Sequence, residues 1–149
     1  MYHSTKTWEQ AKSILDNNFY PSDESRMLGR GIYVSSTLRK TESYGPITFK
    51  LLVYPGRICL VDCQGHPRQK TWQSDFGSAW TPPNTPGMVR YQVVWFRNQQ
   101  HTYLIFFINN MLNFQENCIK RPQQIHILGI CRGIHLLPQS VRGKTRQVA

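Results

Sequence analysis

The stretch MLGRGIYVSS at residues 27–36 constrains the fold of this chain more than any other. Gly29 and Gly31 stand one residue apart and lead into a β-branched and aromatic run, which is typical of a tight bend followed by a strand. Because glycine has no Cβ, the backbone there can bend sharply and approach a bound group closely. Tyr33 then lies just past the bend, where a flat ligand could stack on its ring. By itself, the pattern also fits an ordinary loop with a core tyrosine.

The segments before and after this bend predict short strands and helices. Residues 1–5 are predicted as a strand, followed by Thr7-Trp8-Glu9-Gln10, which has the form of a capping box with Thr7 as N-cap and Gln10 reaching back. The helix that follows ends at Asn17-Asn18 and places four apolar residues on one face: Trp8, Ala11, Ile14 and Leu15. Residues 19–26 are polar and rich in turn formers, so they predict a loop into the bend, with a strand at 32–36 and a short helix at 37–44, capped by Ser36 or Thr37.

The second half of the chain is read in the same way. Residues 48–54 and 57–61 flank the turn dipeptide Pro55-Gly56, which predicts a β-hairpin. Residues 63–88 predict an ordered loop with one helical turn, anchored by Trp72 and Trp80, and residues 125–130 predict a final core strand. The segment 90–113 holds two β-prone runs, which fit either an added hairpin or an insertion that packs poorly.

Motifs on both sides of the bend resemble one known superfamily. Tyr2-His3-Ser4-Thr5 lies upstream, and Leu38-Arg39-Lys40-Thr41-Glu42-Ser43-Tyr44 lies downstream. Together with the bend they resemble the NAD-binding half of the diphtheria-toxin-like ADP-ribosyltransferases, the poly(ADP-ribose) polymerase superfamily. There, a strand ending in His-Gly-Thr is followed by Gly-Lys-Gly-Ile-Tyr-Phe and a short helix with a hydroxyl residue and a second tyrosine.

Two further runs, Gln64–Trp72 and Gly87-Met88-Val89, resemble small interferon-inducible fish proteins of that superfamily, first named for induction by a reovirus. The resemblance covers most of residues 1–89 and about 115–135. It implies an α+β chain with the ADP-ribosyltransferase fold, which has two small, mostly antiparallel sheets and short flanking helices. It also implies NAD as the substrate, a protein acceptor and an antiviral role.

The resemblance assigns NAD-binding roles residue by residue. It implies that His3 donates a hydrogen bond to the 2′-hydroxyl of the adenine-side ribose, and that Tyr33 and Tyr44 sandwich the nicotinamide. Ser4 stands where the family has a glycine whose backbone grips the carboxamide, and Thr41 replaces a serine that bonds the same group. Thr5 and Gly31 complete the NAD-binding set that the resemblance implies.

The third catalytic position has two alternatives. In one register, Glu116-Asn117-Cys118-Ile119 and the run that follows match the subfamily's Glu-Asp-Cys-Val motif, which makes Glu116 the catalytic glutamate beside His3 and Tyr33. In the other, Tyr91 takes that position and leaves no carboxylate. A carboxylate there would stabilise an oxocarbenium-like state as the nicotinamide–ribose bond breaks. Mono-ADP-ribosylation is the activity expected, and the alternative is an inactive protein of the same fold that binds NAD or ADP-ribose.

The net charge of +10 suggests a further alternative. No acidic residue follows Glu116, yet six basic ones do: Lys120, Arg121, Arg132, Arg142, Lys144 and Arg146. A basic face suits the NAD pyrophosphate, RNA or an acidic protein, although it also fits a solvated surface with a basic tail. Nucleic-acid-binding modules usually interleave aromatic residues with their basic ones, and the tail has no aromatic residues.

The totals set the remaining expectations. At 149 residues with 40% hydrophobic content, the chain is expected to form one ADP-ribosyltransferase-like domain at 1–138, with 90–113 as an atypical insert and a disordered basic tail at 139–149. Four cysteines without C-x-x-C spacing and no secretory leader favour a reduced cytoplasmic or nuclear setting. Cys59, Cys63 and His66 are too irregularly spaced to predict a metal site. The longest apolar run, 103–108, is too short to cross a membrane.

Overall fold

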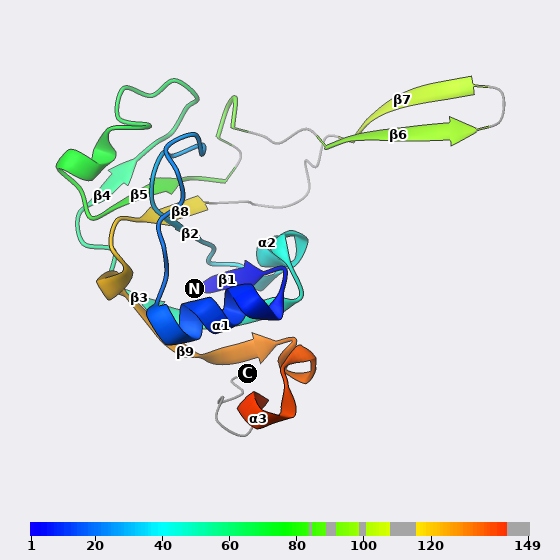
Figure 1. Ribbon diagram of the computed structural model, residues 1–149. Coiled ribbons are helices and arrows are strands. Elements are labelled where there is room, and N and C mark those ends of the chain that lie inside the picture. The colour runs from blue at the N-terminus through cyan, green and yellow to red at the C-terminus, as the bar shows by residue number, and fades with distance from the viewer. Residues whose placement is uncertain (84, 89–91, 99–100, 108–115, 143–149) are drawn as a thin grey trace.

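The computed structural model describes residues 1–83, 85–88, 92–98, 101–107 and 116–142. These residues form an α+β structure with two mostly antiparallel sheets, a separate two-stranded hairpin and a few short helices (Figure 1). The three-stranded sheet has the order β1-β3-β9 and consists of β1 (Tyr2–Thr5), β3 (Ile47–Val53) and β9 (Ile125–Arg132). The four-stranded sheet has the order β2-β8-β5-β4 and consists of β2 (Ile32–Val34), β8 (Glu116–Ile119), β5 (Ser78–Thr81) and β4 (Ile58–Leu60).

The helices are short. They are α1 (Trp8–Asn17), α2 (Leu38–Thr41) and α3 (Gln139–Arg142), with single 3-10 turns at Glu42–Tyr44, Trp72–Ser74, Pro122–Gln124 and Ile134–Leu136. Within the described ranges, no helix combines the length and the hydrophobicity needed to cross a bilayer.

Helix α1 begins where the capping pattern predicts. The Thr7 hydroxyl accepts the backbone N–H of Gln10 at 3.4 Å, and the Gln10 side chain reaches back to the N–H of Lys6 at 3.0 Å. Asn18 ends the helix at a positive φ of 69° and donates its N–H to Ile14. Three of the four predicted apolar positions pack on the core, but Leu15, in the last turn of the helix, is 37% exposed.

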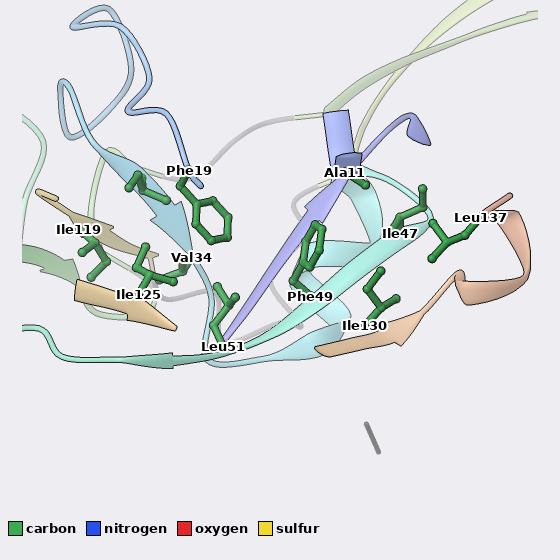
Figure 2. Close-up of a cluster of buried hydrophobic side chains, with 11 residues drawn as sticks. Ala11, Phe19, Val34, Ile47, Phe49, Leu51, Ile119, Ile125, Ile130 and Leu137 are labelled. Atoms are coloured by element: carbon green, nitrogen blue, oxygen red, sulfur yellow. The ribbon is translucent and has the colours of Figure 1, made fainter. Parts of the chain in front are cut away.

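The main core joins the two sheets. Figure 2 shows its side chains converging from β2, β3, β8 and β9, with Ala11 of α1 and Phe19 closing one side. A second buried cluster lies on the opposite face of the four-stranded sheet and includes Leu28, Cys59, Trp72 and Cys118. Neighbouring residues Cys118 and Ile119 of β8 belong to different clusters, so β8 is buried on both faces.

The predicted hairpin across Pro55-Gly56 is wrong. Strand β3 pairs with β1 on one edge and with β9 on the other, so it has no free edge for the next strand. The chain therefore crosses at this turn into the second sheet, where β4 pairs in parallel with β5. Strand β5 itself falls in the segment 63–88 that was predicted to be a loop with one helical turn; the helical turn is present at Trp72–Ser74.

The insert at 90–113 and the C-terminal tail both contain regular secondary structure. Of the two alternatives for the insert at 90–113, the structure has the hairpin, with β6 (Gln92–Asn98) paired to β7 (His101–Phe107), while its remaining residues lie outside the described ranges. Part of the tail predicted to be disordered forms α3, where Arg142 donates to the carbonyl of Leu137 at 2.6 Å. Residues 143–149 lie outside the described ranges.

Candidate functional site

A pocket opens where β1, the end of β2 and α2 meet. Its cavity volume is about 80 Å³ and it is partly open to solvent, so it is smaller than the usual small-molecule site of roughly 300–1,000 Å³. Its wall is formed by Tyr2, His3, Ser4, Tyr33, Val34, Ser35, Lys40, Thr41 and Tyr44. Five of these are residues singled out from the sequence, and they come from three segments that are separate along the chain.

Backbone pairing between the two sheets brings these segments together. Tyr2 and Ser35 exchange hydrogen bonds, from Tyr2 N to Ser35 O at 2.7 Å and from Ser35 N to Tyr2 O at 2.9 Å. This bridge sets the start of β1 beside the end of β2, and α2 begins three residues after Ser35. Gly45, at φ 155°, then brings the chain against β1, since a Cβ there would lie 2.0 Å from the Thr5 carbonyl oxygen.

His3 is fixed in one tautomer when its ring is neutral. Its Nδ1 lies 2.8 Å from the carbonyl oxygen of Tyr33, which can only accept, so Nδ1 carries the proton. Burial lowers the pKa of His3 below its ordinary value, against the opposing effect of this hydrogen bond. The neutral ring therefore leaves Nε2 as a hydrogen-bond acceptor. Phe19 packs edge-on against the ring, with 5.2 Å between the centroids.

Tyr33 is held by the loop that precedes its own strand. Its hydroxyl accepts the N–H of Leu28 at 2.8 Å and donates to the carbonyl of Gly29 at 3.0 Å. Both bonds reach back to the bend, so the bend and the ring form one unit. Gly29 has a positive φ of 71°, as the bend requires.

Ser4 and Thr41 bring hydroxyl groups to the pocket. The Ser4 hydroxyl lies 2.7 Å from that of Thr48, its partner on β3, and Asn18 is the one non-glycine residue with a positive φ in the described ranges, so serine occupies this strand position without backbone strain. Thr41 donates its proton to the carbonyl of Leu38 at 2.6 Å. Its oxygen keeps lone pairs with which it can accept from an amide group.

Lys40 adds a positive charge to the wall of this pocket although only 9% of its surface is exposed. Sequence reasoning missed it, together with Tyr2, Val34 and Ser35. The signal was available for all four, because each lies within two residues of a predicted site residue on a short strand or helix: Tyr2 precedes His3, Val34 and Ser35 follow Tyr33, and Lys40 precedes Thr41.

Two predicted NAD-binding residues have other roles in the described part of the chain. Thr5 is buried, and its hydroxyl lies 3.4 Å from the carbonyl of Thr7 at the start of α1, so it does not line this pocket. Gly31 also lies outside the lining and instead lets β2 approach β8: a Cβ there would lie 2.4 Å from the Cys118 sulfur.

The backbone places Glu116 at the start of β8, between β2 and β5. Its register partner in β5 is Thr81, while Val34 of β2 pairs with Asn117. Glu116 therefore precedes Asn117, the β8 partner of Val34, and Val34 lines the pocket. Tyr91, the competing candidate, lies outside the described ranges, and the strand that follows it, β6, pairs with β7.

The cysteines that were considered for a metal site lie in different environments. Cys59 and Cys118 are buried and Cys63 is exposed, and in the described ranges no three His, Cys, Asp or Glu side chains gather as a metal site would require. Arg132 pairs with Glu42 at 3.2 Å, and Arg142 bonds to backbone carbonyls.

Comparison with known proteins adds no assignment. No protein-family model matches the chain, and no curated protein is significantly similar to it in sequence.

Proposed function

We propose that this protein is an NAD-dependent ADP-ribosyltransferase that binds the nicotinamide end of NAD between β1, β2 and α2. One observation carries the proposal: His3, Ser4, Tyr33, Thr41 and Tyr44 line a single pocket. The resemblance assigned all five to one NAD site on the basis of short motifs. Five residues from three segments gather by chance far less readily than neighbours in one loop.

The arrangement of strands supports the ADP-ribosyltransferase fold as part of this proposal. Two small, mostly antiparallel sheets meet at the Tyr2–Ser35 bridge, and the pocket lies beside it. Short helices flank the sheets, as that fold would require.

The pocket's chemistry suits each part of a nicotinamide riboside. Tyr33 and Tyr44 offer two aromatic rings, and offset stacking contributes on the order of 1 kcal/mol for each ring beyond burial. Thr41 accepts from the carboxamide N–H. His3 takes a role opposite to the one expected from the sequence: its neutral Nε2 accepts a hydrogen bond from a ribose hydroxyl, since Nδ1 already donates to Tyr33.

In the proposed reaction, the bond between ribose C1′ and the nicotinamide nitrogen breaks. Its electron pair goes to the pyridinium nitrogen, which becomes neutral as nicotinamide leaves. A nucleophilic atom of an acceptor protein forms the new bond to C1′ and loses a proton to a carboxylate or water. Glu116 is the proposed carboxylate, and it would stabilise the positive charge that grows on the ribose.

Transfer of labelled ADP-ribose from NAD tests this function. We expect the wild-type chain to modify itself or an added protein, and Glu116→Gln to reduce incorporation by at least about 100-fold, since positioned acid–base groups contribute that much. Glu9→Gln, on the exposed side of α1, is the matched control and should keep wild-type incorporation. Equal incorporation by Glu116→Gln and the wild type would contradict the role of Glu116.

Binding without turnover is the second candidate function. The replacement of the family's glycine by Ser4 favours it, because a serine side chain stands at a pocket position where the family has none. Benzamide is an analogue of nicotinamide. If it raises the melting temperature of the wild-type chain while no label is incorporated, this alternative is supported. An antiviral or interferon-response role rests on the resemblance alone and remains a prediction.

A further inference from the structure

We define the glycine bend as residues 24–31. Side chains of the segment 69–73 donate hydrogen bonds to five backbone carbonyls of this bend. Lys70 Nζ donates to the carbonyls of Glu24 and Ser25 at 3.1 and 3.2 Å. Three more donors follow within the segment: Gln69 Nε2 to Met27 at 2.9 Å, Trp72 Nε1 to Leu28 at 2.7 Å, and Gln73 Nε2 to Arg30 at 2.8 Å.

These four side chains, Gln69, Lys70, Trp72 and Gln73, form what we call the carbonyl clamp. They act on residues more than 40 positions away in sequence, in a loop that has no helix or strand of its own. Backbone groups in such a loop need partners, and the clamp supplies five. The two segments are also tightly packed, because a Cβ on Gly29 would lie 3.3 Å from Gln73 Nε2.

The clamp residues are themselves held by burial and by hydrogen bonds within their own segment. Trp72 is fully buried in the second core, and the backbone N–H of Gly65 donates to Gln69 Oε1 at 2.7 Å. Turns of the backbone support the same stretch, from Trp72 N to Arg68 O at 3.1 Å and from Phe76 N to Trp72 O at 3.0 Å. The bend therefore rests on a fixed platform.

The bend in turn determines where the Tyr33 ring lies. The Tyr33 hydroxyl bonds to Leu28 N and Gly29 O, and Leu28 O is the acceptor for Trp72. A continuous chain of hydrogen bonds thus runs from the clamp through the bend to an aromatic wall of the pocket.

We propose that the carbonyl clamp is a positioning element of the ligand site, which sets the orientation of Tyr33 for stacking on a planar ring. The inference rests on the proposed function, because the planar ring is the nicotinamide of NAD. The four clamp residues do not line the pocket, so their effect on a ligand passes through the bend.

The test compares two variants with the wild-type chain. Lys70→Met with Gln73→Met removes three of the clamp's hydrogen bonds and keeps the apolar stems, at positions away from the buried core. Arg68→Met is the matched control, since Arg68 pairs with Asp75 in the same segment and, among the interactions of the described residues, bonds to no carbonyl of the bend. Two quantities are measured: the Kd for benzamide and the amide hydrogen exchange of Leu28.

We expect the double variant to raise the benzamide Kd by about fivefold, the value of one stacking contact, and to speed Leu28 exchange several-fold. Arg68→Met should match the wild type in both, and the melting temperatures of all three proteins should agree closely. A structural role alone would lower the melting temperature and leave the Kd unchanged.

If either the Kd or the Leu28 exchange of the double variant equals that of the wild type, the inference is overturned. If the wild type binds no benzamide, the proposed function fails instead. In that case Leu28 exchange alone decides whether the clamp holds the bend: faster exchange in the double variant supports the clamp, and unchanged exchange overturns it.

Discussion

His3 couples the ligand pocket to pH. Because its folded pKa lies below the ordinary value of 6.5, the unfolded chain binds more protons than the folded one as the pH falls below about 6.5. The stability that the folded chain keeps while His3 is neutral is therefore fully present above pH 6.5, and it is lost as the pH falls from there toward the lowered pKa. We expect the free energy of unfolding to fall in this window by at most about 1.4 kcal/mol per pH unit from this residue.

Urea unfolding across this pH range measures the effect. His3→Gln should remove the His3 part of the slope, whereas His135→Gln, at an exposed position near the C-terminal end of the described residues, should keep it. Parallel slopes in the wild type and His3→Gln would show that His3 does not titrate as its burial requires.

Gly31 is predicted to act through packing. Gly31→Ala would set a Cβ 2.4 Å from the Cys118 sulfur and 3.0 Å from the Ile119 carbonyl oxygen, which should cost about 1–3 kcal/mol of stability. Cys118→Ala removes the sulfur, so the cost of Gly31→Ala should shrink by about 1 kcal/mol or more in that background. A double-mutant cycle by urea unfolding measures this coupling, and strictly additive costs would contradict the contact.

The pocket residues that could be predicted from the sequence share one property: each belongs to a motif only a few positions long. His3, Tyr33, Thr41 and Tyr44 lie beside each other in the pocket because the motifs that hold them adjoin the same bridge. Thr5 and Gly31 belong to the same motifs, but Thr5 contacts the start of α1 and Gly31 packs against β8. Which neighbours a residue contacts depends on strand pairing, which the motifs do not reveal. The direction of the His3 hydrogen bond also depended on a partner 30 residues away.

Among the secondary-structure elements, α1 has an N-cap that was predicted from its sequence and that a single substitution can test. Thr7 accepts the Gln10 N–H, so Thr7→Ala should lower the free energy of unfolding by about 1 kcal/mol, as the loss of an N-cap usually does. Ser13→Ala, within the same helix, should not lower it, since alanine has the higher helix propensity. Urea unfolding of both variants checks this, and equal stability of Thr7→Ala and the wild type would contradict the cap.

Elements whose partners are distant were the ones that sequence analysis missed. Pro55-Gly56 has the composition of a hairpin turn, but the edges of β3 are occupied by β1 and β9, and only the sheet order reveals this. Strand β5 is four residues long in a segment rich in turn formers, so its local signal is weak. It forms because β8 and β4 pair with its two edges.

At the scale of the whole molecule, the coarse class was predictable and is confirmed: the described residues form an α+β structure with two mostly antiparallel sheets. The family resemblance implied that class, and the short strands and helices predicted from caps and turns agree with it. The way in which the sheets meet is set by long-range contacts, such as the Tyr2–Ser35 bridge, that no short motif contains.

We propose that the pocket beside this bridge holds a nicotinamide ring between Tyr33 and Tyr44. Nuclear Overhauser contacts between the protein and bound benzamide, a nicotinamide analogue, test this binding mode, because they report which side chains touch the ligand. We expect contacts from the benzamide ring protons to the rings of both tyrosines, and their loss in Tyr44→Ala. Binding elsewhere on the chain, or no binding at millimolar benzamide, would contradict it.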